Sequence, residues 1–222
     1  MERRAASPRR EANERNTAII NDYLDKCVYT VENGFTEVSR VFDRQRQVKG
    51  IDITFAYNGE YFLADEKAAS DYINRDHPLR TFSLELAFVN RDNMIMDGWF
   101  LNDEIRTDSY VFVWIDTADM HPISADKPDI MVLDGVNAIK SGDIALVYKE
   151  DVERYLESLG WTKDKLRAKC DQIIDNDGNV NLGNVWKDGC KFSYSTQLVE
   201  QPVNVLVPRD KMIEIAKFHK KI

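Results

Sequence analysis

Hydrophobic and polar residues alternate most regularly between residues 51 and 64. Apolar side chains recur at every second position from Ile51 to Phe55, and a second apolar run covers residues 61–64. Between the two runs stands Asn58-Gly59, a dipeptide typical of a tight β-hairpin turn. The pattern therefore predicts two antiparallel strands joined by an Asn-Gly turn.

Other stretches show either helical spacing of apolar residues or clusters of β-branched and aromatic residues. The predicted helices cover residues 16–30, 150–159, 162–174 and 210–220. The predicted strands cover residues 99–101, 110–115, 144–148 and 198–207. Residues 35–42 fit either type, and Asp177-Gly178 and Asp188-Gly189 predict short hairpins. Because helices and strands are interleaved, we expect an α/β fold.

Length and composition favour one domain. The chain has 222 residues, of which 43% are hydrophobic and 31% are charged, and it contains no long Pro/Gly/Ser-rich linker. We expect a single domain over residues 16–222, preceded by a basic, flexible arm over residues 1–15 that Pro8 interrupts. The arm is either a solvated end of the chain or a contact for phosphates.

Charge and cysteine content narrow the classes of protein. The formal net charge of −8 counts against a generic nucleic-acid binder, although it leaves room for a local basic groove. Cys27, Cys170 and Cys190 are scattered and lack the spacing of a zinc site, so we expect reduced thiols. No apolar run is long enough to cross a bilayer and no signal-peptide core follows the first arginines, so we expect a cytoplasmic protein without membrane contact.

The predicted hairpin carries two acids and a lysine. Asp65 and Lys67 project from the same face of the second strand, and the turn brings Asp52 towards Asp65. Two carboxylates that lie so close repel each other unless a cation lies between them, and Mg²⁺ prefers oxygen ligands. Lys67 can hold or deprotonate a water molecule and offset charge on a phosphate, which suits phosphodiester hydrolysis. Glu66 projects from the opposite face, where we expect a structural ion pair, while its backbone carbonyl is a further candidate metal ligand.

These residues form a pattern that resembles the core of the PD-(D/E)XK nuclease superfamily, which includes restriction endonucleases, Holliday junction resolvases and repair nucleases. The pattern is Gln47-x-x-Gly-Ile-Asp52, a hairpin, and then Asp65-x-Lys67. The resemblance implies a restriction endonuclease-like core, a central mixed β-sheet flanked by helices. It also implies that Asp52 and Asp65 bind Mg²⁺, for which Mn²⁺ can substitute, and that Lys67 is catalytic. The motif lies within residues 47–68. The resemblance covers about residues 12 to 116, and the region after about residue 117 is an unmatched elaboration.

Further residues are candidates for supporting roles through the same resemblance. It suggests Gln47 as a supporting residue near the metal or DNA and Glu85 as another polar residue of the site. It also suggests that an acid in the first helix joins the site, with Glu14 as the first candidate and Glu32 and Glu37 as alternatives.

The expected function is a metal-dependent nuclease that hydrolyses DNA in restriction, phage or mobile-element processing, or repair, with an endonuclease favoured over an exonuclease. Two other classes stay open. One is a non-catalytic nucleic-acid-binding or protein-interaction module that retains the nuclease fold, and the other is a structural protein in which these charges form a surface ion-pair cluster. The sequence leaves open DNA versus RNA, the specificity, and whether a homodimer forms to cut both strands.

Overall fold

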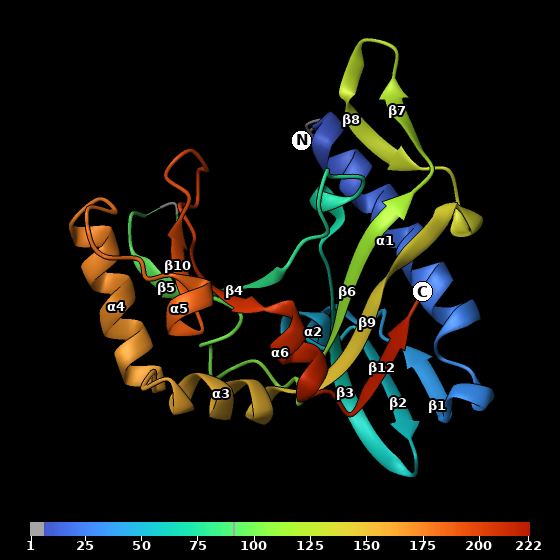
Figure 1. The fold of residues 1–222 in the computed structure, drawn as a ribbon, viewed down its shortest axis with the longest axis horizontal. Coiled ribbons are helices and arrows are strands. Elements are labelled where there is room, and N and C mark those ends of the chain that lie inside the picture. Colours follow the sequence, from blue (N-terminus) through green and yellow to red (C-terminus); the bar gives the residue numbers. More distant parts are fainter. Residues whose placement is uncertain (1–6, 91) are drawn as a thin grey trace.

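A mixed six-stranded β-sheet is the centre of the computed structural model, which describes residues 7–90 and 92–222. The strands lie in the order β1 (Phe35–Arg40), β2 (Ile53–Tyr57), β3 (Glu60–Ala68), β6 (Ser109–Ala118), β9 (Ile139–Tyr148) and β12 (Phe218–Lys221) (Figure 1). Neighbouring strands are antiparallel except β3 and β6, which are parallel. Helices flank this sheet, so the expected α/β class with a mixed central sheet is confirmed.

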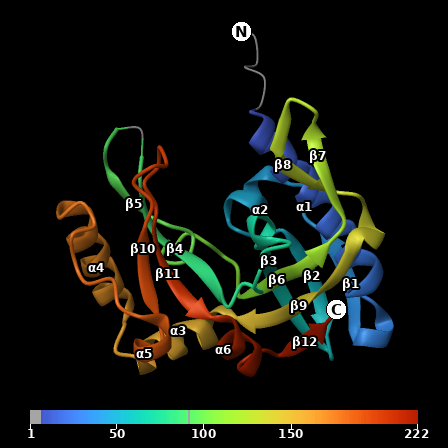
Figure 2. The same cartoon turned by 45° about the horizontal axis from the view of Figure 1, so that its top comes forward.

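A second group of elements lies, along the chain, in the segments that connect the strands of this sheet. A four-stranded sheet has the order β10 (Lys191–Tyr194), β11 (Val203–Pro208), β4 (Thr81–Val89) and β5 (Ile95–Asp97), and β7 (Met120–Ser124) pairs with β8 (Lys127–Leu133). The helices are α1 (Pro8–Cys27), α2 (Arg44–Val48), α3 (Lys149–Ser158), α4 (Lys163–Asp175), α5 (Val185–Asp188) and α6 (Arg209–Glu214). Figure 2 shows the four-stranded sheet with α4 on one side of the molecule and α1 on the other.

The predicted hairpin is confirmed and is formed by β2 and β3. Asn58 and Gly59 both have positive φ angles, of 49° and 84°, as a tight turn between twisted antiparallel strands requires. The register pairs Tyr57 with Glu60 and Ile53 with Ala64. This register leaves Asp52 one residue before β2, level with Asp65 on β3.

Two hydrophobic cores cover opposite faces of the central sheet. On β6, Tyr110, Phe112 and Trp114 belong to one core, and the residues between them belong to the other. The first core contains buried residues of the four-stranded sheet, α3, α4 and α6, whereas the second contains buried residues of α1. Side chains on the sheet are therefore enclosed on both faces, because side chains of a strand alternate between faces.

The N-terminal part of the fold corrects the expectation of a flexible arm. Helix α1 begins at Pro8, and the Ser7 side chain caps it by accepting a hydrogen bond from the backbone N–H of Arg10. Ala12 is buried, so this first part of the helix packs against the protein. Residues 8–15 are therefore helical, and residues 1–6 of the predicted arm lie outside the described residues.

Later elements were predicted in part. Strands β6 and β9 and helices α3 and α4 are confirmed, and the segment left open at residues 35–42 forms β1. The strand predicted at residues 99–101 is wrong, because these residues form a turn that packs Phe100 and Leu101 into a core. The last helix ends at Glu214, and β12 replaces its predicted second half by pairing with β9.

The predicted hairpins and the last long strand also differ from the structure. Asp177-Gly178 lies in the turn after α4, and Asp188-Gly189 ends α5, with Gly189 in the left-handed conformation. Strand β11 begins only at Val203, after a turn. Both Asp-Gly segments thus follow helices and do not form hairpins, because a glycine in the left-handed conformation suits a helix C-terminus as well as a hairpin turn.

Cys27, Cys170 and Cys190 are free thiols, as predicted. None of the helices in residues 7–90 and 92–222 is long and apolar enough to cross a membrane.

A buried arginine connects α6 to the central sheet. The Arg209 guanidinium donates to both carboxylate oxygens of Asp116, at 2.7 and 2.9 Å, and also to Asp143. Its guanidinium carbon lies 5.4 Å from the centroid of the Trp114 ring, and Arg209 is buried. Asp143 also contacts Nε2 of His219 at 2.6 Å. The network therefore joins α6, β6, β9 and β12.

Replacing Arg209 by Ala is expected to lower the free energy of unfolding by about 3–5 kcal/mol, because two poorly solvated carboxylates lose their cation. Urea denaturation measures this change. The control is Lys211→Ala, which removes an exposed pair with Glu214 on the same helix and should cost under about 1 kcal/mol. Equal effects of the two substitutions would contradict the role assigned to Arg209.

Candidate active site

The hairpin of β2 and β3 brings together the two carboxylates predicted from the sequence. Asp65 and Lys67 project from the face of β3 that meets Tyr110 of the parallel strand β6. Asp52 stands directly before β2, and its Oδ2 accepts a hydrogen bond of 3.1 Å from the backbone N–H of Glu66. The structure therefore places Asp52, Asp65 and Lys67 at one point on the sheet.

Asp65 is the most enclosed member of this group. The residue is only 3% exposed, and its Oδ2 lies 2.8 Å from Nζ of Lys67. Burial raises the pKa of Asp65 to about 7; the Lys67 charge opposes this shift and the Asp52 carboxylate adds to it. A single ammonium therefore does not compensate fully for two neighbouring acids in a site with little water.

Lys67 connects the carboxylates to an open pocket. Its Nζ lies 4.7 Å from the centroid of the Trp99 ring, which is a cation–π distance. Both residues line a pocket of about 270 Å³ that Tyr72 and Phe82 also line. The ammonium thus has the carboxylates on one side and a space that can receive a ligand on the other. Sequence reasoning missed Trp99, which was assigned to a strand.

Glu66 has the structural role expected from its position on the opposite face. Its carboxylate accepts hydrogen bonds from the Tyr29 hydroxyl at 2.7 Å and from Nη1 of Arg40 at 2.6 Å. Arg40 also binds Asp25 of α1 through Nε. This interaction connects β3 to α1. The assignment of the Glu66 carbonyl as a metal ligand stays a prediction.

The supporting residues suggested by the resemblance lie in different places. The Gln47 side chain donates a hydrogen bond of 2.9 Å to the backbone carbonyl of Val41, so it holds the chain that precedes Asp52. Glu85 is half-buried on β4; burial raises its pKa, and the nearby Lys67 charge lowers it. The structure therefore keeps Glu85 close to the site, whereas Gln47 acts through the backbone.

Glu14 lies apart from the carboxylates. It is exposed on α1 and pairs with Arg10 one turn earlier, at 2.8 Å. The alternatives Glu32 and Glu37 are also exposed. Within the described part of the chain, no hydrogen bond or ion pair connects any of the three with Asp52 or Asp65.

Two further polar residues that interact electrostatically with Asp65 were not identified from the sequence. The Tyr110 hydroxyl is buried and has no hydrogen-bond partner among the described residues; burial raises its pKa, and the charges of Asp65 and Glu153 raise it further. Burial lowers the pKa of Lys149, at the start of α3, although the charges of Glu153 and Asp65 oppose this. Tyr110 fitted a core strand pattern and Lys149 begins a helix, so neither gave a functional signal.

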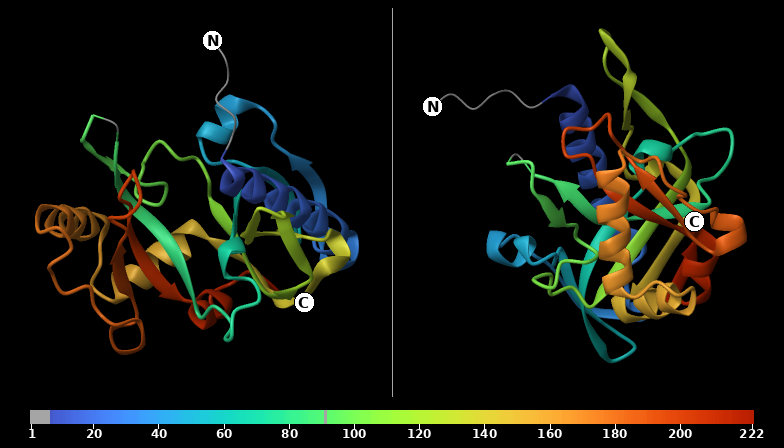
Figure 3. Two further views of the ribbon diagram at one scale, coloured as in Figure 1. Left: turned by 90° about the horizontal axis from the view of Figure 1, so that it is seen from above. Right: turned by 90° about the vertical axis from the view of Figure 1, so that its left-hand side faces the viewer.

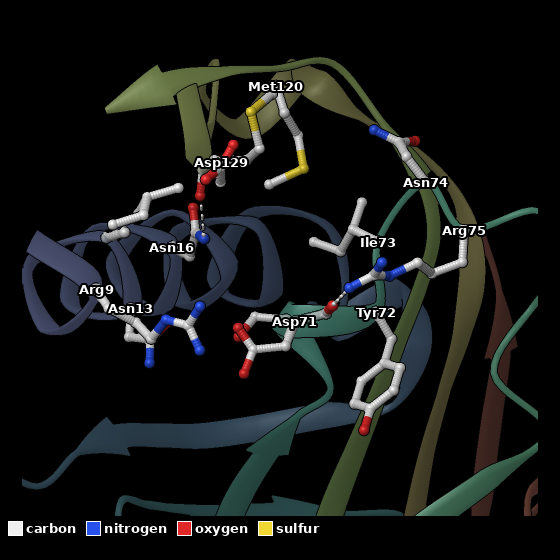
Figure 4. Close-up of a pocket in the computed structure, with 14 residues that line it drawn as sticks. Arg9, Asn13, Asn16, Asp71, Tyr72, Ile73, Asn74, Arg75, Met120 and Asp129 are labelled. Carbon is white, nitrogen blue, oxygen red and sulfur yellow. Dashed lines mark hydrogen bonds between the residues drawn. The ribbon is translucent and has the colours of Figure 1, made fainter. Parts of the chain in front are cut away.

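A larger pocket, of about 460 Å³, lies between α1, residues 70–75 and β8, as Figure 4 shows. Several of its polar groups are occupied in holding the backbone. Asn16 donates to the carbonyl of Met131 and accepts from the N–H of Leu133, and Arg75 donates to the carbonyl of Asp71. This pocket contains neither Asp52 nor Asp65, so the candidate chemistry lies elsewhere.

The donor atoms at the hairpin suit a hard cation. Asp52 and Asp65 supply carboxylate oxygens, and the Glu66 peptide lies against Asp52. Among the residues that the structure describes, no cluster of three or more His, Cys, Asp or Glu could by itself hold a metal ion. A cation at this pair would therefore need water, backbone or substrate oxygens as its other ligands, which is the usual arrangement for Mg²⁺.

Comparisons with protein-family models, with curated proteins and with solved structures find no match for this chain.

The carboxyl group of Asp65 is expected to titrate near pH 7 in EDTA, and two substitutions should move its pKa in opposite directions. Asp52→Asn should lower the pKa, because it removes a negative neighbour, whereas Lys67→Met should raise it, because it removes the stabilising cation. Carbon-13 NMR of the carboxyl groups measures both shifts. Shifts of the same sign would contradict the electrostatic account.

The same raised pKa predicts a pH dependence of stability. Asp65 keeps its proton to a higher pH in the folded protein than in the unfolded chain. Its contribution to the free energy of unfolding should therefore decrease as the pH rises from about 4 to about 7. Urea denaturation of metal-free protein across this range measures the effect. Asp65→Asn should flatten the dependence, and an unchanged profile in that variant would exclude Asp65 as its source.

Proposed function

We propose that this protein is a metal-dependent nuclease that hydrolyses DNA phosphodiester bonds at Asp52, Asp65 and Lys67. The observation that carries the proposal is the burial of Asp65 beside a second carboxylate, with the Lys67 ammonium 2.8 Å from its oxygen and facing a pocket. A buried acid with a raised pKa next to a positioned cation is a feature of functional sites.

Asp52 and Asp65 would hold Mg²⁺ or Mn²⁺ together with the Glu66 carbonyl. Such an ion, when bound, would polarise a phosphate oxygen and make a water molecule a better nucleophile. Lys67 has the complementary role: its ammonium can orient the attacking water or offset the charge that develops on the phosphate. The Trp99 ring below Nζ limits where this ammonium can move.

The arrangement of the chain supports assignment to the PD-(D/E)XK superfamily and to its restriction endonuclease-like fold. Strands β1, β2, β3 and β6 are neighbours in a mixed sheet in which β3 and β6 are parallel, and α1 packs against one face of that sheet. Asp52 precedes the second strand, and Asp65 and Lys67 lie near the end of the third. An endonuclease is favoured over an exonuclease, and cutting of both strands would require a homodimer or two binding events.

The other classes explain these observations less well. A surface ion-pair cluster does not account for Asp65, which is only 3% exposed and carries a raised pKa. A non-catalytic binding module with the same fold is the alternative, and it would have no need for Lys67 to be placed between two acids and a pocket.

Cleavage of supercoiled plasmid and of single-stranded DNA tests the proposal directly. With Mg²⁺ or Mn²⁺ the native chain should cut, and EDTA should stop cutting. Asp52→Asn, Asp65→Asn and Lys67→Met should each lower the cleavage rate by about 100-fold or more, as expected when a group that stabilises transition-state charge is lost.

Glu60→Gln is the matched control, because Glu60 is an exposed acid at the turn end of the same strand. It should leave the rate within about twofold of the native value, since surface changes away from a site have small effects. Absence of cleavage with either metal on either DNA would leave the non-catalytic module as the better assignment. Cleavage that survives Asp65→Asn would place the activity elsewhere in the chain.

A further inference from the structure

Residues 42–49 form a loop, here called the excursion, that leaves β1 and returns to Asp52. Hydrogen bonds join the two ends of this loop. The N–H of Val41 donates to the carbonyl of Asp52 at 2.8 Å, and the N–H of Ile51 donates to the carbonyl of Arg46 at 3.2 Å. The Gln47 side chain closes the loop by binding the carbonyl of Val41. Figure 3 shows α2, which forms the middle of this excursion, standing out from the strands that it connects. Its base therefore holds Asp52.

The excursion concentrates positive charge in an acidic protein. Residues 42–49 contain two arginines and one lysine against a single aspartate, in a chain with a net charge of −8. Lys49 forms an ion pair with Glu104, and Arg40, which precedes the excursion on β1, binds Glu66 and Asp25.

The remaining charges of the excursion are directed to solvent. Arg44 and Arg46 are both exposed, and neither forms an ion pair with another described residue. Asp43 forms no ion pair with either arginine; its carboxylate caps α2 by accepting from the backbone N–H groups of Gln45 and Arg46. Two guanidinium groups are thus available to an anionic partner.

Large apolar side chains stand beside these arginines. The Phe42 residue is 85% exposed and Val48 is 66% exposed. Exposed single apolar residues are common, but an almost fully exposed phenylalanine between cations is a combination that suits a nucleic acid. Phosphates attract the guanidinium groups, and an aromatic ring can stack on a base.

We propose that residues 42–49 are a DNA-contacting element in which Arg44 and Arg46 bind phosphates and Phe42 stacks on a base. This inference rests on the proposed function, and it adds how the substrate is held next to Asp52. Because the N–H of Val41 is bonded to the carbonyl of Asp52, the excursion begins and ends at the chain segment that carries one of the candidate carboxylates. The negative charge of the phosphates complements the two exposed arginines.

The test measures binding of fluorescently labelled DNA by anisotropy in EDTA, so that no cutting occurs. A duplex and a single strand of the same sequence are compared over a range of salt concentrations. Arg44→Ala/Arg46→Ala should weaken binding about 10-fold or more and should reduce the slope of log affinity against log salt by about 1.4–1.8, because two phosphate contacts are lost. Lys169→Ala/Lys191→Ala removes two cations on α4 and β10 and should change neither quantity.

Phe42 is tested separately from the charges. Phe42→Ala should weaken binding about 5-fold or more with an unchanged salt slope, and Phe42→Trp should restore it, because stacking is worth roughly 1–3 kcal/mol per base. Thermal melting of each variant confirms that it is folded. Stronger loss on the single strand than on the duplex would identify unpaired bases as the partner of Phe42.

The outcomes separate this inference from the proposed function. If the arginine variant is folded and binds DNA with native affinity and salt slope, the inference is overturned, whether or not the native chain cuts DNA. Failure of the native chain to bind either DNA also overturns it and points to a protein partner for this element. Binding that depends on Arg44, Arg46 and Phe42 in a chain that never cuts DNA would support the inference while rejecting the nuclease.

Discussion

The arrangement of the candidate site depends on the burial of the Asp65 carboxylate. A carboxyl group that is 3% exposed loses most of its hydration, and here it also faces a second acid, Asp52. Lys67 compensates only in part, since burial still raises the pKa of Asp65 to about 7. This arrangement follows from the fold, because both faces of the central sheet are covered and because the Asn58-Gly59 turn sets the register that brings Asp52 level with Asp65.

Because side chains alternate along β3, its structural ion pair lies on one face of the sheet and its candidate active-site residues lie on the other. Glu66 projects towards α1, where Tyr29 and Arg40 satisfy its carboxylate and fix the strand. Its neighbours Asp65 and Lys67 project to the other face, where Trp99 and a pocket meet the ammonium. An acidic net charge is compatible with a polyanionic substrate in this arrangement, because a bound divalent ion would change the local field and because the excursion carries two exposed arginines, Arg44 and Arg46.

The hairpin and its three charged residues could be predicted from the sequence because they depend on local rules: the two-residue period of a strand, the preference of Asn-Gly for tight turns, and the spacing of Asp65 and Lys67. Contacts between distant segments could not be predicted in this way. Trp99 reaches Lys67 from a turn that has the composition of a strand, and β12 forms from a helix-like pattern because it completes the edge of the sheet beside β9. The contact of Gln47 with the backbone carbonyl of Val41 was also hidden, since it depends on how the chain folds back before Asp52.

The location of a bound divalent ion tests the central claim most directly. Crystals soaked in Mn²⁺, with diffraction data collected at the manganese absorption edge, would locate the ion by its anomalous scattering. If Asp52 and Asp65 hold the ion, we expect a peak in contact with the carboxylates of both residues, and a rearranged Lys67 ammonium that no longer pairs with Asp65 alone. A map without a peak at this pair at saturating Mn²⁺, with the Asp65–Lys67 contact unchanged, would contradict the claim.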